Sequence, residues 1–98
     1  MLKAKLIKEY AQGPSFRKAY EVEEGGPLPR FVVCSAVESC FDHGGPELLI
    51  FAGNEDGKVI DYMDLEGSYR GGTDHEEALR RAGYKVAKDE REALSNAE

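Results

Sequence analysis

Two histidines are the residues of this 98-residue chain best suited to metal binding or acid–base chemistry. His43 follows Asp42 and His75 follows Asp74, and each pair lies beside a glycine-rich stretch. If the two turns met in space, two imidazoles and the neighbouring carboxylates could bind a divalent metal or a small molecule. The histidines are 32 residues apart, which matches no zinc motif. We therefore interpret each as a surface histidine in a loop, and predict no metal and no other cofactor.

Three further patterns could support chemistry, and each has a simpler interpretation. Residues 71–73, Gly-Gly-Thr, lead into an expected helix and could bind an anion through free backbone N–H groups, but the acids that follow oppose an anion. Residues 54–57 resemble half of a calcium loop but lack its bidentate glutamate, so we interpret them as a turn. Cys34 and Ser35 lie mid-strand rather than on an exposed elbow, which does not fit a nucleophile. We predict no catalytic residues and no enzyme activity.

Acidic residues are concentrated in the middle of the chain. Residues 31–77 hold eleven acids against Lys58 and Arg70, a balance of −9, whereas the whole chain has a net charge of −6. Direct nucleic-acid binding is disfavoured, because phosphate neutralisation requires clustered basic residues. An acidic face suits a basic protein partner. We predict an interaction surface made of Glu55, Asp56, Asp61, Asp64 and Glu66. Alternatively, the acidic block mimics nucleic acid and inhibits a DNA-binding protein.

The elements that must position these residues are centred on a hairpin within residues 47–65. Two apolar runs flank residues 54–57, Asn-Glu-Asp-Gly, and Gly57 supplies the positive φ that such a tight turn needs. The apolar run at residues 30–41 is the natural neighbouring strand. Gly57→Val is therefore expected to destabilise the domain more than Gly26→Val, since Gly26 lies in a longer loop with room to adjust.

The remaining segments complete a small α+β domain. Residues 2–10 and 16–23 alternate like an outer hairpin, with a slip of the pattern after Leu6. A helix over about residues 74–82 can be capped in two registers, Thr73 with Glu76 or Asp74 with Glu77. Residues 84–86 can add a short edge strand after it. We predict an antiparallel meander of about five strands with one C-terminal helix packed on one face. Residues 1–86 form this single domain, and residues 87–98 form a charged, disordered tail.

The strands at residues 31–37 and 48–52 are apolar on both faces, so both faces of the sheet need cover. The helix can cover one face, and the other is left with apolar side chains such as Phe31, Val33 and Phe51 or, in the other register, their opposite-parity neighbours. We predict a homodimer that buries this second face. The competing explanation is that the loops at residues 24–29 and 65–72 fold back over it.

The cysteines and the hydropathy pattern favour a cytoplasmic protein. Cys34 and Cys40 would lie about 20 Å apart in one strand, whereas a disulfide requires Cα atoms within about 7 Å. No apolar run approaches the roughly 20 residues of a membrane helix. The first residues, MLKAKLIK, contain no continuous apolar signal segment. We predict reduced cysteines, a cytoplasmic location and no membrane association.

The stretch LEGSYRGGTDHEEALRRAGY, residues 65–84, resembles a segment of small uncharacterised actinobacterial and phage proteins. It covers about a fifth of the chain and implies a phage-type protein but no activity. The absence of a catalytic constellation, more than any positive motif, leads us to predict a small acidic cytosolic protein-binding or regulatory module. The alternative is a small-molecule or metal-binding protein, or a minor enzyme, that uses the glycine-rich turns around His43 and His75.

Overall fold

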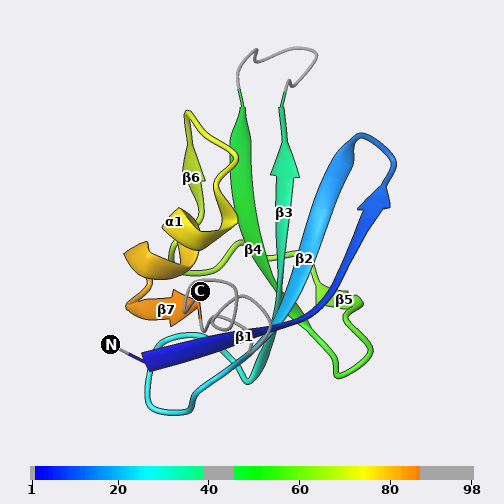
Figure 1. The fold of residues 1–98 in the computed structure, drawn as a ribbon. Coiled ribbons are helices and arrows are strands. Elements are labelled where there is room, and N and C mark those ends of the chain that lie inside the picture. Colours follow the sequence, from blue (N-terminus) through cyan, green and yellow to red (C-terminus); the bar gives the residue numbers. More distant parts are fainter. Residues whose placement is uncertain (1, 39–45, 87–98) are drawn as a thin grey trace, which may run out of the picture.

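The computed structural model describes residues 2–38 and 46–86, which form one mixed β-sheet with a short helix (Figure 1). The elements in chain order are β1 (Leu2–Gln12), β2 (Ser15–Val22), β3 (Phe31–Val37), β4 (Glu47–Gly53), β5 (Val59–Asp61), β6 (Tyr69–Arg70), α1 (His75–Arg81) and β7 (Tyr84–Val86). The strand order is β5-β4-β3-β2-β1-β7, and β6 pairs with β4. The predicted α+β class is confirmed at this level.

The sheet is not the simple five-stranded antiparallel meander that the sequence suggested. Strands β1 to β5 do pair antiparallel in chain order, but β6 and β7 bring the sheet to seven strands. β7 pairs parallel with β1, with Leu2 opposite Tyr84 and Ala4 opposite Val86. A parallel pair requires a crossover connection, and here the chain crosses over by way of β6 and α1. Residues 84–86 form the short edge strand suggested by the sequence, but its parallel pairing was not expected, and the two-residue β6 is too short to show a hydropathy pattern.

Local turn and cap signals in the sequence are confirmed. Gly57 has a φ of +81°, and Asn54 Oδ1 accepts hydrogen bonds from the Asp56 and Lys58 N–H groups, both at 3.0 Å. The register of β1 against β2 shifts between Leu6 and Lys8, where the alternation slips. Of the two capping registers, the structure shows the second. Asp74 Oδ1 accepts from the N–H groups of residues 76 and 77 at 3.0 and 3.2 Å.

The main core lies between the sheet and α1. It contains inward side chains of β2, β3 and β4 and the buried face of the helix: Tyr20, Val32, Cys34, Leu48, Ile50, Ala78 and Leu79. Figure 1 shows α1 lying against the sheet beside β4 and β6, with β7 below it next to the start of β1. Because α1 has only seven residues, its stability comes from this packing more than from its own hydrogen bonds.

The loop between β2 and β3 is part of this core, which corrects the expectation for Gly26. Tyr84 is fully buried, and its Oη accepts a hydrogen bond from the Leu28 N–H at 3.1 Å. A Cβ added at Gly26 would lie 2.2 Å from Tyr84 Oη and 2.6 Å from Leu2 Cδ1. The loop has no room to adjust there. The expectation that Gly26 lies in a loop with room to adjust was wrong, because Tyr84, 58 positions away in the chain, packs against it.

The second face of the sheet is covered in its centre by the chain itself. Val33 and Phe51 are only 1% and 7% exposed. The β4–β5 turn folds over this face, so that Gly57 lies against Ala19 and its carbonyl accepts a hydrogen bond from Tyr10 Oη at 2.8 Å. The expectation that this face is left bare was wrong at Val33 and Phe51. Leu28 and Leu65 from the two suggested loops pack on the α1 side instead. Dimerisation stays a prediction.

Candidate interaction surface

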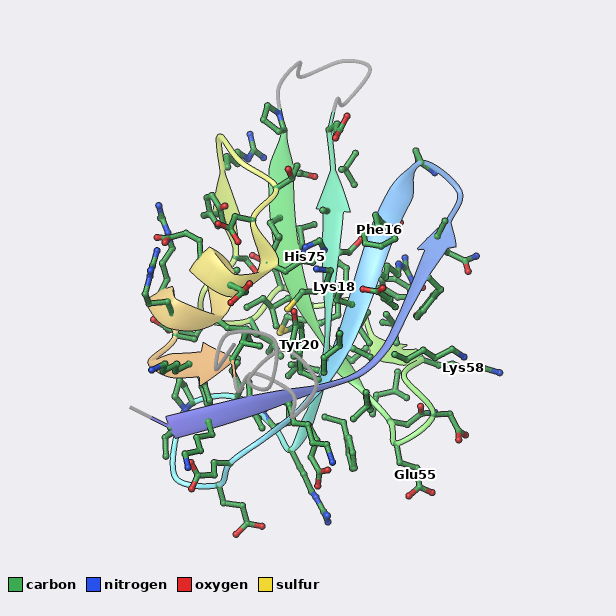
Figure 2. All side chains as sticks on the ribbon, in the orientation of Figure 1. Phe16, Lys18, Tyr20, Glu55, Lys58 and His75 are labelled. Carbon is green, nitrogen blue, oxygen red and sulfur yellow. The ribbon has the colours of Figure 1, made fainter. Side chains whose placement is uncertain are left out.

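The five acids of the predicted interaction surface lie in one stretch between β4 and β6, and all five are exposed. Glu55 and Asp56 occupy the β4–β5 turn, Asp61 ends β5, and Asp64 and Glu66 follow it. Figure 2 shows Glu55 and Lys58 in this turn, far from the labelled group around His75. The stretch 55–66 is called the acidic segment below.

The acids of this segment are available to a partner. Within residues 2–38 and 46–86, the ion pairs involve the carboxylates of Glu21, Glu47 and Glu77 and none of the five acids. Asp61 accepts a hydrogen bond from the Met63 N–H at 3.0 Å, which shapes the backbone after β5. Five acids with one basic residue, Lys58, give the segment a balance of −4.

Apolar side chains are exposed between these acids, and the sequence reasoning missed their importance. Ile60, Tyr62 and Met63 are 65%, 64% and 70% exposed. The signal was present as the run Ile-Asp-Tyr-Met-Asp at residues 60–64, in which apolar and acidic residues are mixed. Three large apolar side chains are thus exposed within four consecutive residues, and apolar side chains that gather on a surface can mark a binding site.

The acidic segment is held in place by hydrogen bonds to the edge of β4 that does not pair with β3. β5 pairs with Ala52 and Gly53, and β6 pairs with residues 47 and 48. Between them, the Ile50 carbonyl accepts from the Leu65 N–H at 2.8 Å, and the Ile50 N–H donates to Ser68 Oγ at 2.8 Å. The edge of β4 is thus satisfied along its length, and the exposed side chains stand on a fixed backbone.

A surface pocket of about 460 Å³ opens beside the segment. Leu49 and Phe51 of β4 line it on the face away from α1, together with Tyr62 and Asp64. The Tyr62 ring packs edge-on against Phe51, with centroids 5.1 Å apart, and the Arg17 guanidinium lies 5.7 Å from the Tyr62 centroid. The pocket combines an apolar floor, an aromatic wall and a carboxylate.

His75 is not the surface histidine that the sequence suggested. It is 7% exposed, its Nε2 lies 3.2 Å from the Phe16 carbonyl oxygen, and its ring packs edge-on against the Phe16 ring at 5.9 Å. Figure 2 shows His75 close to Phe16, Lys18 and Tyr20, between α1 and β2. Burial lowers the pKa of His75 below its usual value, so the imidazole is held in its neutral form more strongly than in water.

His75 also lines a second surface pocket, of about 470 Å³, together with Ser15, Phe16, Glu38 and Thr73. Its hydrogen bond to the Phe16 carbonyl requires a proton on Nε2, so the neutral ring would carry its free lone pair on Nδ1. That lone pair could accept a hydrogen bond from a small molecule in the pocket.

The other predicted chemistry is not brought together in the described part of the chain. His43 and Cys40 lie outside the described residues, so the meeting of the two histidines stays a hypothesis. Among residues 2–38 and 46–86, no group of three or more His, Cys, Asp or Glu side chains is placed to hold a metal. Cys34 is buried with a free thiol, and burial raises its pKa, which suppresses the reactive thiolate.

Two further findings concern membrane-spanning helices and similarity to known proteins. In the described part of the chain, no helix has the length and hydropathy needed to cross a membrane. No family model, no curated protein and no solved structure matches this chain. The resemblance of residues 65–84 to actinobacterial and phage proteins therefore stays an interpretation of the sequence.

Proposed function

We propose that this protein is a small binding module that recognises a basic surface of a protein partner through its acidic segment. The observation that carries the proposal is the combination on residues 60–64 of exposed apolar side chains with acids that form no ion pair in the described residues. Apolar side chains supply the buried centre of an interface. The surrounding acids steer a basic partner and select it against acidic competitors.

The fixed backbone of the segment supports the same function. Leu65 and Ser68 are bonded to Ile50, so Tyr62 and Met63 stand on a chain that is already ordered. A partner that binds here does not have to order this backbone, and the conformational cost of binding is reduced accordingly.

Charge reversal tests the proposal. The double variant Asp61→Lys/Asp64→Lys should weaken binding to a partner captured from host lysate and reverse the effect of salt on affinity. Glu9→Lys/Glu24→Lys is the matched control, because both residues are exposed acids outside the segment and the change in net charge is the same. Calorimetry with the purified partner at low and high salt measures both effects. Equal affinities of the wild-type protein and the segment variant would contradict the proposal.

Mimicry of nucleic acid is a special case of the same surface. If the partner is a DNA-binding protein, duplex DNA should compete with the acidic segment for the same site on it. The Asp61→Lys/Asp64→Lys variant should then be displaced from the partner by less DNA than the wild-type protein. A partner whose binding is unaffected by excess DNA assigns the segment to ordinary protein recognition.

A second candidate function is small-molecule binding in the pocket beside His75, which the burial of that imidazole at a pocket wall favours. Saturation-transfer NMR with a panel of small carboxylates and heterocycles tests it, with His75→Gln as the matched variant. If the saturation-transfer signals of a compound are the same for the wild-type protein and His75→Gln, this pocket is not its binding site. The cytoplasmic location, the absence of enzyme activity and the homodimer stay predictions from the sequence.

A further inference from the structure

We infer that the pocket between β4 and residues 62–64 binds an arginine side chain of the protein partner. This inference rests on the proposed function, since it names the partner residue that the same surface would take. The pocket has a volume of about 460 Å³. That value lies within the roughly 300–1,000 Å³ typical of small ligand sites, so one long side chain fits with room for its neighbours.

The floor of the pocket suits the apolar stem of a long side chain. Leu49 and Phe51 are two residues apart on β4 and lie on the same face of the sheet, opposite α1. The Tyr62 ring, inclined at 62° to the Phe51 ring, forms the adjoining wall. The methylene groups of an arginine pack against such apolar surface while the charged head remains at the rim.

One carboxylate in the lining of the pocket has no ion-pair partner among the described residues, although the Arg17 guanidinium lies against the nearby Tyr62 ring. Three charged side chains line it, and two of them, Glu47 and Arg70, pair with each other at 3.7 Å. The third, Asp64, takes part in no ion pair within the described ranges. The exposed acids Asp61 and Glu66 on either side of Asp64 add to the negative potential at this rim.

The aromatic wall favours a guanidinium over an ammonium. The Arg17 guanidinium already lies 5.7 Å from the centroid of the Tyr62 ring, yet Tyr62 remains 64% exposed. A guanidinium is flat, weakly hydrated and able to stack on an aromatic ring while it donates two parallel hydrogen bonds to a carboxylate. Tyr62 and Asp64 are two positions apart and can serve both contacts.

The test is an NMR titration of the labelled full-length chain with the peptide acetyl-Leu-Arg-Leu-amide. The matched control peptide carries citrulline, which has the shape of arginine without its charge. We expect saturable amide shifts at Leu49, Phe51, Asp64 and Arg70 for the arginine peptide, and clearly weaker binding of the citrulline peptide. Asp64→Asn should weaken binding of the arginine peptide by about two- to five-fold, which corresponds to the free energy of an exposed ion pair. Glu24→Gln, which removes an exposed acid outside both the pocket and the acidic segment, should leave the affinity unchanged.

Equal binding of the two peptides, equal losses in the two variants, or shifts confined to residues outside the pocket would overturn the inference. These outcomes are separable from those of the charge-reversal experiment. If Asp61→Lys/Asp64→Lys weakens the whole partner but the arginine peptide does not enter the pocket, the proposed function stands and the arginine assignment fails. If the whole partner ignores the reversal, the proposed function fails by itself.

Discussion

Tyr84→Phe should destabilise the fold by about 1–3 kcal/mol, the cost of a buried donor that loses its acceptor. Tyr84 is fully buried and Leu28 is 6% exposed, and the hydroxyl accepts the Leu28 N–H at 3.1 Å. The change removes one oxygen and leaves the ring in place, so the expected cost is that of the unsatisfied N–H rather than of a large cavity. In a domain of this size, each kcal/mol lowers the Tm by about 4–8 °C.

Urea unfolding followed by circular dichroism measures this effect. Tyr69→Phe is the matched control, because the Tyr69 hydroxyl accepts the Asp74 N–H at 3.1 Å at an exposed site where water can replace it. We expect the control to cost less than about 0.5 kcal/mol, as most surface changes do. A Tyr84→Phe variant as stable as the wild type, or no less stable than the control, would refute the reasoning.

A double-mutant cycle with Gly26→Ala separates the hydroxyl from the rest of the contact. The added methyl group would lie 2.2 Å from Tyr84 Oη, so the wild-type chain must shift to accept it. In the Tyr84→Phe background the approach to the hydroxyl is absent, although those to the ring Cζ and to Leu2 Cδ1 remain, so Gly26→Ala should cost less than in the wild type but not become neutral. The same geometry reverses our initial ranking. Gly26→Val should now destabilise the domain at least as much as Gly57→Val, despite the positive φ of Gly57.

Three further predictions concern the helix cap, the oligomeric state and pH. Asp74→Ala should cost about 0.5–2 kcal/mol, since Asp74 caps two helix N–H groups, whereas Thr73→Ala should change the urea midpoint little. Equal losses would mean that the cap is misassigned. The predicted homodimer should have twice the 10.8 kDa chain mass in light scattering, and a monomer mass at micromolar concentration excludes it. Because the native pKa of His75 is lowered, its contribution to stability is complete above the unfolded pKa of about 6.5 and is lost as pH falls through that value towards the native pKa. The wild-type stability measured relative to His75→Gln should therefore fall between about pH 7 and 5, and a flat difference would show that His75 is not buried in its neutral form.

The parts of the fold that were predictable from the sequence depend on local rules. The turn at residues 54–57, the cap at Asp74 and the antiparallel pairing of β1 to β5 each follow from residues adjacent in the chain or from simple alternation. The parallel pairing of β7 with β1 and the packing of Gly26 on Tyr84 join residues more than fifty positions apart. No local pattern reports such contacts, because they depend on the path of the whole chain.

The candidate site was predictable in its charge but not in its shape. The five acids were named from composition and are exposed, but exposure of acids is the ordinary outcome for charged residues. The pocket was not predictable, because Leu49 and Phe51 read simply as members of a buried strand. Their side chains line a surface only because Tyr62 returns over one end of β4 while β6 pairs at the other end. His75 was expected at the surface, since nothing near it in the sequence indicates that Phe16 packs on it.

The exposure of the acidic segment follows from how the edge of β4 is protected. β5 is only three residues long, so the remaining edge groups of β4 must be satisfied by Leu65 and Ser68. The chain has to run outside β4 to reach them, and the side chains that it carries face solvent. A two-fold dimer built on the segment would bring two copies of this acidic path together, which their like charges oppose. Salt screens that repulsion and also screens attraction to a basic partner. Salt should therefore strengthen self-association through this segment and weaken the binding of a basic partner, so the sign of the salt effect distinguishes the two uses of one surface.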